Sequence, residues 1–267
     1  MASKFTNIRV FQDTLKRIAS DEDLTAAVLQ SKKWTSLYYA DQYPPFEAGE
    51  SQNTEIAVTH DRSFQSAMRL KSENPEAKIA VLNFANAFTP GGGVTIGSNA
   101  QEEGLCRCST LYPVLNRKYL KENYYGYHKK IGDLKATDTV IYSQDIIIFK
   151  TDRNTPKEMP KQDWVKVDVM TIAAPDLRKI SMSNEELFEC HVKRAVHMLA
   201  VAANQEADIL VLGAFGCGAF RNNPKVVARA YREALEKFPK AFKKVEFAIY
   251  CSDEEQKNYH MFKDTLA

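Results

Sequence analysis

The sequence contains neither a long apolar run nor a marked excess of charge of either sign. Its 267 residues include 36 Lys and Arg against 34 Asp and Glu, which gives a formal net charge of +2. Because no stretch of about 20 apolar residues occurs, we expect no membrane-spanning helix and no membrane partner. The even charge balance gives no sign of a surface that coats DNA or RNA, so we expect no sequence-specific nucleic-acid binding, although a local phosphate site is compatible with it.

Cysteine is also scarce. The five cysteines form an odd number with no repeated Cys-x-x-Cys pair, which indicates a reducing compartment rather than a disulfide framework. Residues 1–20 carry charges throughout and lack the apolar core of a secretory signal. Cys106-x-Cys108 has no clear second ligand pair. The sequence therefore predicts a cytoplasmic protein with no metal site and no cofactor.

The composition itself is typical of a globular protein, with 44% hydrophobic and 26% charged residues. Residues 5–33 show the helical spacing of apolar side chains, with a break and a new helix start at Ser20-Asp21. Residues 34–54 are rich in aromatic residues and proline and predict an irregular loop. We therefore expect residues 1–54 to form an N-terminal helical extension that packs on a main domain of residues 55–267.

Beyond residue 54, short apolar stretches alternate with amphipathic ones, which is the pattern of strands separated by helices. Strands are predicted at residues 55–59, 78–84, 140–142, 146–149, 164–173, 208–212 and 245–250, and helices at residues 63–71, 100–112, 185–203, from Asn223-Pro224 onward, and at 254–265. This order predicts an α/β fold with helices on both faces of one sheet. Such sheets bind ligands beyond the carboxyl ends of their strands, so the loops after residues 83, 172 and 212 are the candidate sites.

The loop after the predicted strand 78–84 contains three consecutive glycines, Gly91-Gly92-Gly93. Consecutive glycines cost backbone entropy and are tolerated where no Cβ fits, either because another surface comes very close or because φ is positive. The alternative is a tight connecting turn, for which one or two glycines would suffice. We interpret the three glycines as a point of close approach.

Eight residues after Gly93, at the start of the predicted helix 100–112, stand Gln101-Glu102-Glu103. Two acids in a first helical turn often only complement the helix dipole, and that alternative stays open. Adjacent side chains on a helix point about 100° apart, so this is not the opposed carboxylate pair of ordinary glycosidases. If this turn carries chemistry, one glutamate transfers the proton and the other binds or orients the substrate.

The loop after the predicted strand 208–212 reads Gly213-Ala214-Phe215-Gly216-Cys217-Gly218-Ala219-Phe220. It lacks the G-x-G-x-x-G dinucleotide fingerprint, but the free amides of a glycine-rich loop can form a nest for a diphosphate. Phe220 offers a flat apolar face for a ring; the alternative is a glycine hinge with Phe220 in the core. We interpret Cys217 as a small residue that fits the turn rather than as a nucleophile.

In combination, these segments resemble the microbial (bacterial-type) poly(ADP-ribose) glycohydrolases, a macrodomain-like family. The resemblance rests on a Gly-Gly-Gly stretch separated by the seven residues Val94–Ala100 from Gln101-Glu102-Glu103, and it runs from about residue 10 to the end of the chain. Its other parts are Asn83-Phe84-Ala85-Asn86, Pro90, Cys106-Arg107, Ser109, Leu111-Tyr112, Ile141-Tyr142-Ser143, Asp145, Ala173-Ala174-Pro175 and residues 213–222. The chain departs from the family's pattern at Gln144 and at Lys150-Thr151-Asp152.

The resemblance implies a macrodomain-like three-layer α/β/α sandwich with a mixed sheet, in which residues 55–267 are the catalytic domain. It implies hydrolysis of the ribose–ribose O-glycosidic bond in ADP-ribose chains, with poly(ADP-ribose) or an ADP-ribosylated macromolecule as substrate and ADP-ribose as product. It also implies that Glu103 is the catalytic acid and that Glu102 and Gln101 bind around the distal ribose. The further substrate-binding residues that it implies are Asn86, Gly91, Gly92, Gly93, Gly216, Cys217, Gly218, Ala219 and Phe220.

Hydrolysis of an acetal at neutral pH needs a proton for the leaving oxygen. A glutamate among glycines and apolar residues is expected to be desolvated, which raises its pKa. We therefore expect Glu103 to protonate the leaving 2′-oxygen and then to deprotonate the attacking water. Two alternatives stay open: a hydrolase that removes single ADP-ribose groups from protein or nucleic acid, and a macrodomain that binds ADP-ribose without cleaving it. A scaffold protein is a weaker third alternative, because it leaves the glycine loops unexplained.

Overall fold

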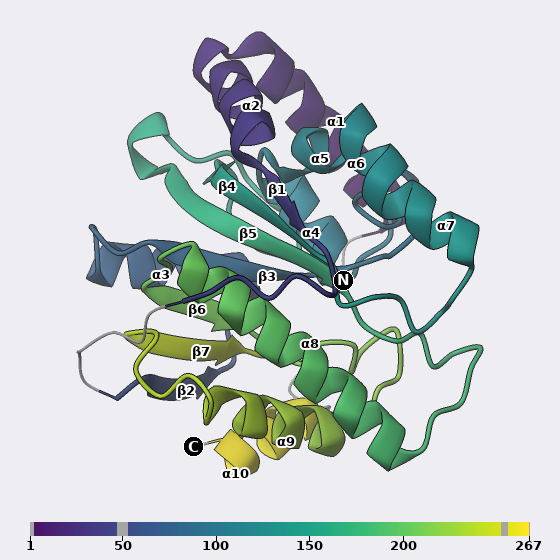
Figure 1. Ribbon diagram of the computed structural model, residues 1–267. Coiled ribbons are helices and arrows are strands. Elements are labelled where there is room, and N and C mark those ends of the chain that lie inside the picture. The colour runs from purple at the N-terminus through teal and green to yellow at the C-terminus, as the bar shows by residue number, and fades with distance from the viewer. Residues whose placement is uncertain (1–2, 47–52, 252–255, 267) are drawn as a thin grey trace.

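A computed structural model describes residues 3–46, 53–251 and 256–266 (Figure 1). Within these residues the chain forms a mixed sheet of seven strands in the order β1-β4-β5-β3-β6-β7-β2. The strands are β1 (Ser36–Tyr38), β2 (Glu55–Thr59), β3 (Ile79–Ala85), β4 (Val140–Ile148), β5 (Val165–Ala173), β6 (Ile209–Leu212) and β7 (Lys244–Ala248). β4 is antiparallel to β1 and β5, whereas β5, β3, β6, β7 and β2 are parallel to one another. The parallel strands therefore all end at the same edge of the sheet.

Helices cover both faces of this sheet. They are α1 (Lys4–Ser20), α2 (Glu22–Trp34), α3 (Ser63–Glu73), α4 (Gln101–Cys108), α5 (Leu111–Leu115), α6 (Lys118–Leu120), α7 (Tyr127–Ile131), α8 (Asn184–Asn204), α9 (Pro224–Leu235) and α10 (Lys257–Leu266), with the short segments η1 (Val94–Ile96), η2 (Lys121–Gly126) and η3 (Lys161–Asp163). Neighbouring residues of β3 enter different cores, because successive strand side chains point to opposite faces. Val81 packs in the core with α1 to α5, and Leu82 packs with α8, α9 and α10, which Figure 1 shows crossing their face of the sheet. The predicted three-layer α/β/α fold is confirmed.

Several helices begin at a residue whose side chain caps the helix. Asp21 separates α1 from α2, and its side chain accepts a hydrogen bond from the backbone of Leu24 at 3.1 Å. Ser183 and Glu186 form a capping box at the start of α8, with bonds of 3.1 and 2.8 Å. Asn223 caps α9 just before its N-terminal proline. Side-chain acceptors satisfy N–H groups that a helix start leaves without a partner, which is why these boundaries were predictable.

Two predicted elements, residues 34–54 and the helix 100–112, differ from the structure. Residues 34–54, predicted as loop, contain the strand β1, whose three residues pair with β4 but are too few for a visible period; residues 47–52 lie outside the described part of the chain. The predicted helix 100–112 is two helices, α4 and α5, because Ser109 has an extended backbone and bridges to Ile148. The predicted start of the closing helix at residue 254 also lies outside the described residues.

The predicted strands 140–142 and 146–149 belong to one strand, β4, with a bulge between Ser143 and Ile146. Asp145 has a φ of +57° within this bulge. Gln144, one of the departures from the family pattern, also lies there, and its amide donates to the side chain of Gln205 at 2.7 Å. The division into an N-terminal extension and a main domain after residue 54 stays a prediction. In the structure, β1 from the N-terminal segment is the edge strand of the sheet, beside β4.

Candidate active site

The loops after β3 and β6 begin side by side, because these two parallel strands are neighbours in the sheet (Figure 1). Phe84, at the end of β3, connects them. Its ring centroid lies 5.8 Å from that of Phe215 in the loop after β6, and a Cβ on Gly213 would lie 2.9 Å from its ring. Its backbone N–H donates to Gln101 Oε1 at 2.9 Å. The structure thus brings together the two glycine-rich loops that the sequence singled out.

Gln101 fixes the first turn of α4 to the end of β3. Besides accepting from the backbone of Phe84, its side chain donates to the carbonyl of Leu82 at 2.6 Å and to Ser63 Oγ at 3.0 Å. These contacts are all with the protein, and they set the position from which the next two residues project. The role of Gln101 in binding ribose stays a prediction.

Glu102 is buried, with 3% of its surface exposed. Its Oε2 accepts from the backbone N–H of Asn86 at 2.8 Å, and its Oε1 faces the side-chain amide of Asn83 at 3.4 Å. Burial raises the pKa of Glu102 to about 8; the Asn86 N–H opposes this rise and the charge of Glu103 adds to it. Glu102 is therefore mostly protonated at pH 7. Glu103 is buried as predicted, with 6% of its surface exposed, and burial raises the pKa of its neighbour Glu102.

The Glu103 carboxyl group accepts hydrogen bonds from the backbone at both ends of residues 93–100. Its Oε1 accepts from the N–H of Gly93 at 2.8 Å, and its Oε2 accepts from the N–H of Ala100 at 3.0 Å. The second bond caps α4, so the helix-capping alternative is present in the structure. The bond to Gly93 reaches across to the glycine turn and is not part of the cap, so Glu103 also joins the helix to that turn.

The three glycines pack directly on these carboxyl groups. Gly92 has a φ of +57°, and a Cβ there would lie 2.6 Å from Glu103 Oε1 and 2.9 Å from Glu102 Oε2. Gly91, with a φ of +68°, is backed by the ring of Tyr112. The side chain of Asn86 shapes the start of this turn by accepting from two backbone N–H groups of the loop. Close approach therefore explains the glycines better than a simple turn does.

The loop after β6 is open on one side. Among the described residues, the N–H groups of Gly216, Gly218, Ala219 and Phe220 donate to no protein atom. A Cβ on Gly218 would contact nothing within 4 Å. Successive free N–H groups of this kind form an anion-binding nest. Burial raises the pKa of the Cys217 thiol well above its usual range, so this cysteine is no thiolate nucleophile.

Two residues behind this loop were not predicted as part of the site. His191 Nε2 donates to Asn222 Oδ1 at 2.7 Å, and the Asn222 amide donates to the carbonyls of Pro175 and Phe220 at 2.8 and 3.2 Å. Burial lowers the pKa of His191 to about 4, so its ring is neutral at pH 7. His191 follows Phe188 by three residues and directly precedes Val192 in α8, and this spacing beside apolar residues was the available signal of a buried polar residue.

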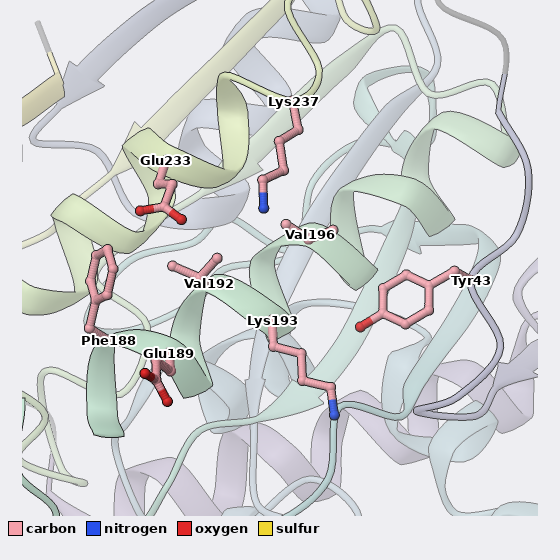
Figure 2. A pocket seen from close by; sticks show the side chains of 8 residues that line it. All are labelled: Tyr43, Phe188, Glu189, Val192, Lys193, Val196, Glu233 and Lys237. Carbon is pink, nitrogen blue, oxygen red and sulfur yellow. The ribbon is translucent and has the colours of Figure 1, made fainter. Parts of the chain in front are cut away.

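A hollow away from the two glycine-rich loops lies between α8, α9 and the segment before β2 (Figure 2). It is lined by Tyr43, Phe188, Glu189, Val192, Lys193, Val196, Glu233 and Lys237. None of the predicted site residues lies in it, and it is formed by outer surfaces of helices rather than by strand ends. Within the described residues, no group of three or more His, Cys, Asp or Glu side chains is arranged to hold a metal ion. Nor is any described helix both long enough and apolar enough to cross a membrane.

The model of the catalytic domain of microbial-type PARG, the poly(ADP-ribose) glycohydrolases, matches residues 11–151 of this chain. The chain belongs to the microbial-type poly(ADP-ribose) glycohydrolase family. The matched residues include the glycine turn, α4 and both glutamates. This family consists of glycoside hydrolases that act on poly(ADP-ribose).

Solved structures of poly(ADP-ribose) glycohydrolases share this fold over most of the chain. The protein from Thermomonospora curvata is 27% identical with a TM-score of 0.86, and the match covers 98% of this chain and 99% of that one. The same protein bound to the inhibitor ADP-HPD gives 27% identity and a TM-score of 0.83, over 97% and 99% of the two chains. The protein from Deinococcus radiodurans in complex with ADP-ribose is 34% identical with a TM-score of 0.78, over 89% and 96%. A search of curated proteins gives no match.

Proposed function

We propose that this chain hydrolyses the ribose–ribose O-glycosidic bond of poly(ADP-ribose) and releases ADP-ribose. The observation that carries the proposal is the packing of Glu102 and Glu103 against Gly92, beside an open nest of backbone N–H groups. Membership of the family supports it, as does the relative solved with ADP-ribose. We also propose a cytoplasmic setting, on the odd cysteine count.

The charge of the glutamate pair suits an anionic substrate. Two ionised carboxylates side by side would repel a diphosphate-bearing ligand. Because the pKa of Glu102 is about 8, this residue keeps its proton at neutral pH. A protonated carboxyl is a hydrogen-bond donor as well as an acceptor, so Glu102 is suited to bind a ribose hydroxyl. The remaining proton transfer then falls to Glu103.

In the proposed mechanism, the protonated form of Glu103 gives its proton to the leaving 2′-oxygen while the bond from C1″ to that oxygen breaks. Glu103 then takes a proton from a water that attacks C1″, which restores the acid and completes the hydrolysis. Gly91, Gly92 and Gly93 hold the distal ribose against the carboxyl groups. The diphosphate on the free N–H groups of Gly216, Gly218 and Ala219 positions the water, and Phe220 lies beside the terminal ribose. The Cys217 N–H donates to the carbonyl of Ala214 at 3.1 Å and is not one of these donors.

The remaining predicted residues have supporting roles in this proposal. Gln101 holds α4 on β3, and Asn86 orients Glu102 through its backbone N–H. Cys217 contributes a backbone position in the diphosphate loop. No step needs a metal or a cofactor, because the side chains supply the proton and the backbone supplies the donors to the anion.

The test is product analysis after incubation with purified poly(ADP-ribose). Glu103→Gln should lose at least 10²-fold in kcat, the lower range for acid–base catalysis, and should still bind ADP-ribose, since Gln has nearly the same shape. Glu76→Gln, at an exposed glutamate, is the matched control and should behave like the parent.

Two further substrates, mono-ADP-ribosylated protein and ADP-ribosylated nucleic acid, separate the alternatives. Release of ADP-ribose from the polymer supports the proposal. Release only from a singly modified substrate would assign a different hydrolase activity to the same site. Binding of ADP-ribose with no release from any substrate would make the chain a binding protein, and full activity in Glu103→Gln would remove that residue from the mechanism.

A further inference from the structure

The first helix reaches the segment that holds Glu103. We name residues 93–100 the catalytic loop, because the N–H groups at its two ends, Gly93 and Ala100, both donate to the Glu103 carboxyl group. In the middle of this loop, the carbonyl of Gly97 accepts from the side-chain amide of Asn7 in α1 at 3.1 Å. Gly97 has a φ of +78°, and a Cβ there would overlap the carbonyl oxygen of Lys4. The backbone of α1 therefore touches the catalytic loop directly.

A second bond from α1 reaches α4. Thr14 Oγ1 lies 2.6 Å from the carbonyl oxygen of Arg107 and accepts from Lys150 Nζ at 2.9 Å. The single hydroxyl hydrogen has two carbonyl acceptors within reach, Val10 of the same helix at 2.9 Å and Arg107 at 2.6 Å, and the shorter contact is the one to Arg107. The Arg107 guanidinium in turn donates to the carbonyl of Ser98 at 2.7 Å, within the catalytic loop. Lys150, where the chain departs from the family pattern, thus takes part in this arrangement.

The buried face of α1 is unusual in being partly polar. Its buried residues are Asn7, Phe11, Thr14 and Ile18, and Asn7 and Thr14 are 1% and 0% exposed. Buried polar groups are costly unless they are hydrogen-bonded, and each of these two side chains bonds to a backbone carbonyl of the catalytic loop or of α4. Packing alone would be served as well by apolar residues at both positions. The polar pair instead fixes two points of the backbone around Glu103.

We propose that α1 is a brace for the catalytic loop, in which Asn7 and Thr14 are positioning residues for the Glu103 carboxyl group. Neither residue touches the substrate. They keep the Gly93 and Ala100 N–H groups where both can bond to Glu103, so the acid stays aimed at the ribose. The proposal rests on the proposed function for its catalytic consequence, but the brace itself is a property of the free protein.

The test uses variants that keep side-chain volume. Thr14→Val and Asn7→Leu each remove one donor, whereas Thr14→Ser keeps the hydroxyl, and Gln12→Ala changes an exposed residue of the same helix. Three quantities are measured in the full-length chain: kcat on poly(ADP-ribose), the Kd for ADP-ribose, and the amide hydrogen-exchange rates of residues 93–100. Melting temperatures identify any variant that fails to fold.

Thr14→Val and Asn7→Leu should each lower kcat about tenfold, a fraction of the cost of a 1 Å misplacement of a catalytic group. The Kd for ADP-ribose should stay within about twofold, since the nest after β6 is untouched, and exchange at Gly93 and Ala100 should become faster. Thr14→Ser and Gln12→Ala should match the parent. Unchanged exchange and kcat in both donor-removing variants would overturn the brace, as would equal losses of kcat and of ADP-ribose affinity. A parent chain that leaves the polymer intact would refute the proposed function, and hydrogen exchange would still decide on the brace.

Discussion

The loop after β3 and the loop after β6 begin at the same edge of the sheet but are built in opposite ways. In the first, the space above Gly92 is filled by the oxygens of Glu102 and Glu103. In the second, the space above Gly218 is empty and several N–H groups point at no protein acceptor. A closed loop fixes its own side chains, and an open one leaves its donors for a ligand. We therefore propose that the first loop controls kcat and the second controls the affinity for ADP-ribose.

The largest expected effect is the pH dependence that Glu102 gives to stability. Its pKa is about 8 in the folded chain against an ordinary 4.5, so the folded state binds the proton more tightly and stability falls as the pH rises from 4.5 to about 8. At ~1.4 kcal/mol per pKa unit, this loss reaches ~5 kcal/mol. Glu102→Gln, which is neutral at every pH, should remove most of the decline in urea-unfolding free energy between pH 4.5 and about 8.

Glu76→Gln is the control for this measurement and should keep the decline of the parent. An unfolding free energy that falls just as steeply with pH in Glu102→Gln would mean that Glu102 is hydrated in solution. The first loop would then be as open as the second, and the contrast between them would disappear.

The second loop should show the opposite pH dependence, through His191. Its pKa is about 4 when folded against an ordinary 6.5, so its stabilising contribution is complete above 6.5 and is lost as the pH falls toward 4. The loss amounts to ~3 kcal/mol at ~1.4 kcal/mol per pKa unit. His191→Gln should be less sensitive to acid than the parent in thermal unfolding, whereas His260→Gln, at an exposed histidine, should not. Equal acid sensitivity in all three would place the proton on some other group.

Local sequence signals predicted most of the fold. The strand 55–59 has the predicted bounds, and α8 begins at Asn184, one residue before the predicted start. β1 and the break at Ser109 were missed because both depend on pairing with β4, a partner far along the chain. A strand of three residues is too short to show an alternating pattern. The helical pattern of residues 100–112 does not indicate that Ser109 pairs with a distant strand.

The candidate site was predictable to a similar depth. The glycine turn and Gln101-Glu102-Glu103 are contiguous motifs, so the sequence located the loops. The sequence predicted desolvation of Glu103 alone, whereas both glutamates are buried and burial raises the pKa of Glu102. The bonds of His191 to Asn222 and of Asn7 to Gly97 join residues 31 and 90 positions apart. Contacts of this kind depend on tertiary packing, so no local sequence pattern indicates them.

Gly92→Ala should lower the rate of catalysis, with a smaller change in free energy than the two pH effects above. The new Cβ would lie 2.6 Å from Glu103 Oε1 at a φ of +57°, so the carboxyl group must move. We expect kcat on poly(ADP-ribose) to fall about 10²-fold, as for a 1 Å misplacement, with a much smaller change in the Kd for ADP-ribose. Gly104→Ala, next to Glu103 but with nothing within 4 Å of its Cβ, is the matched control. A kcat within about twofold of the parent in Gly92→Ala would show that the loop after β3 adjusts to the added methyl group and does not fix the position of Glu103.

Gly218→Ala should give the reverse pattern and the smallest effect. Its Cβ contacts nothing in the free chain and its φ is not positive, so the melting temperature should match that of the parent. A diphosphate seated on the neighbouring N–H groups would meet the added methyl group, so we expect the Kd for ADP-ribose to rise about tenfold, or ~1.4 kcal/mol, measured by calorimetry. The kcat at saturating polymer should stay within about twofold, because Glu103 is held by the other loop. If the affinity is unchanged while kcat falls, the anion does not bind at this nest, and the division of rate and affinity between the two loops is wrong.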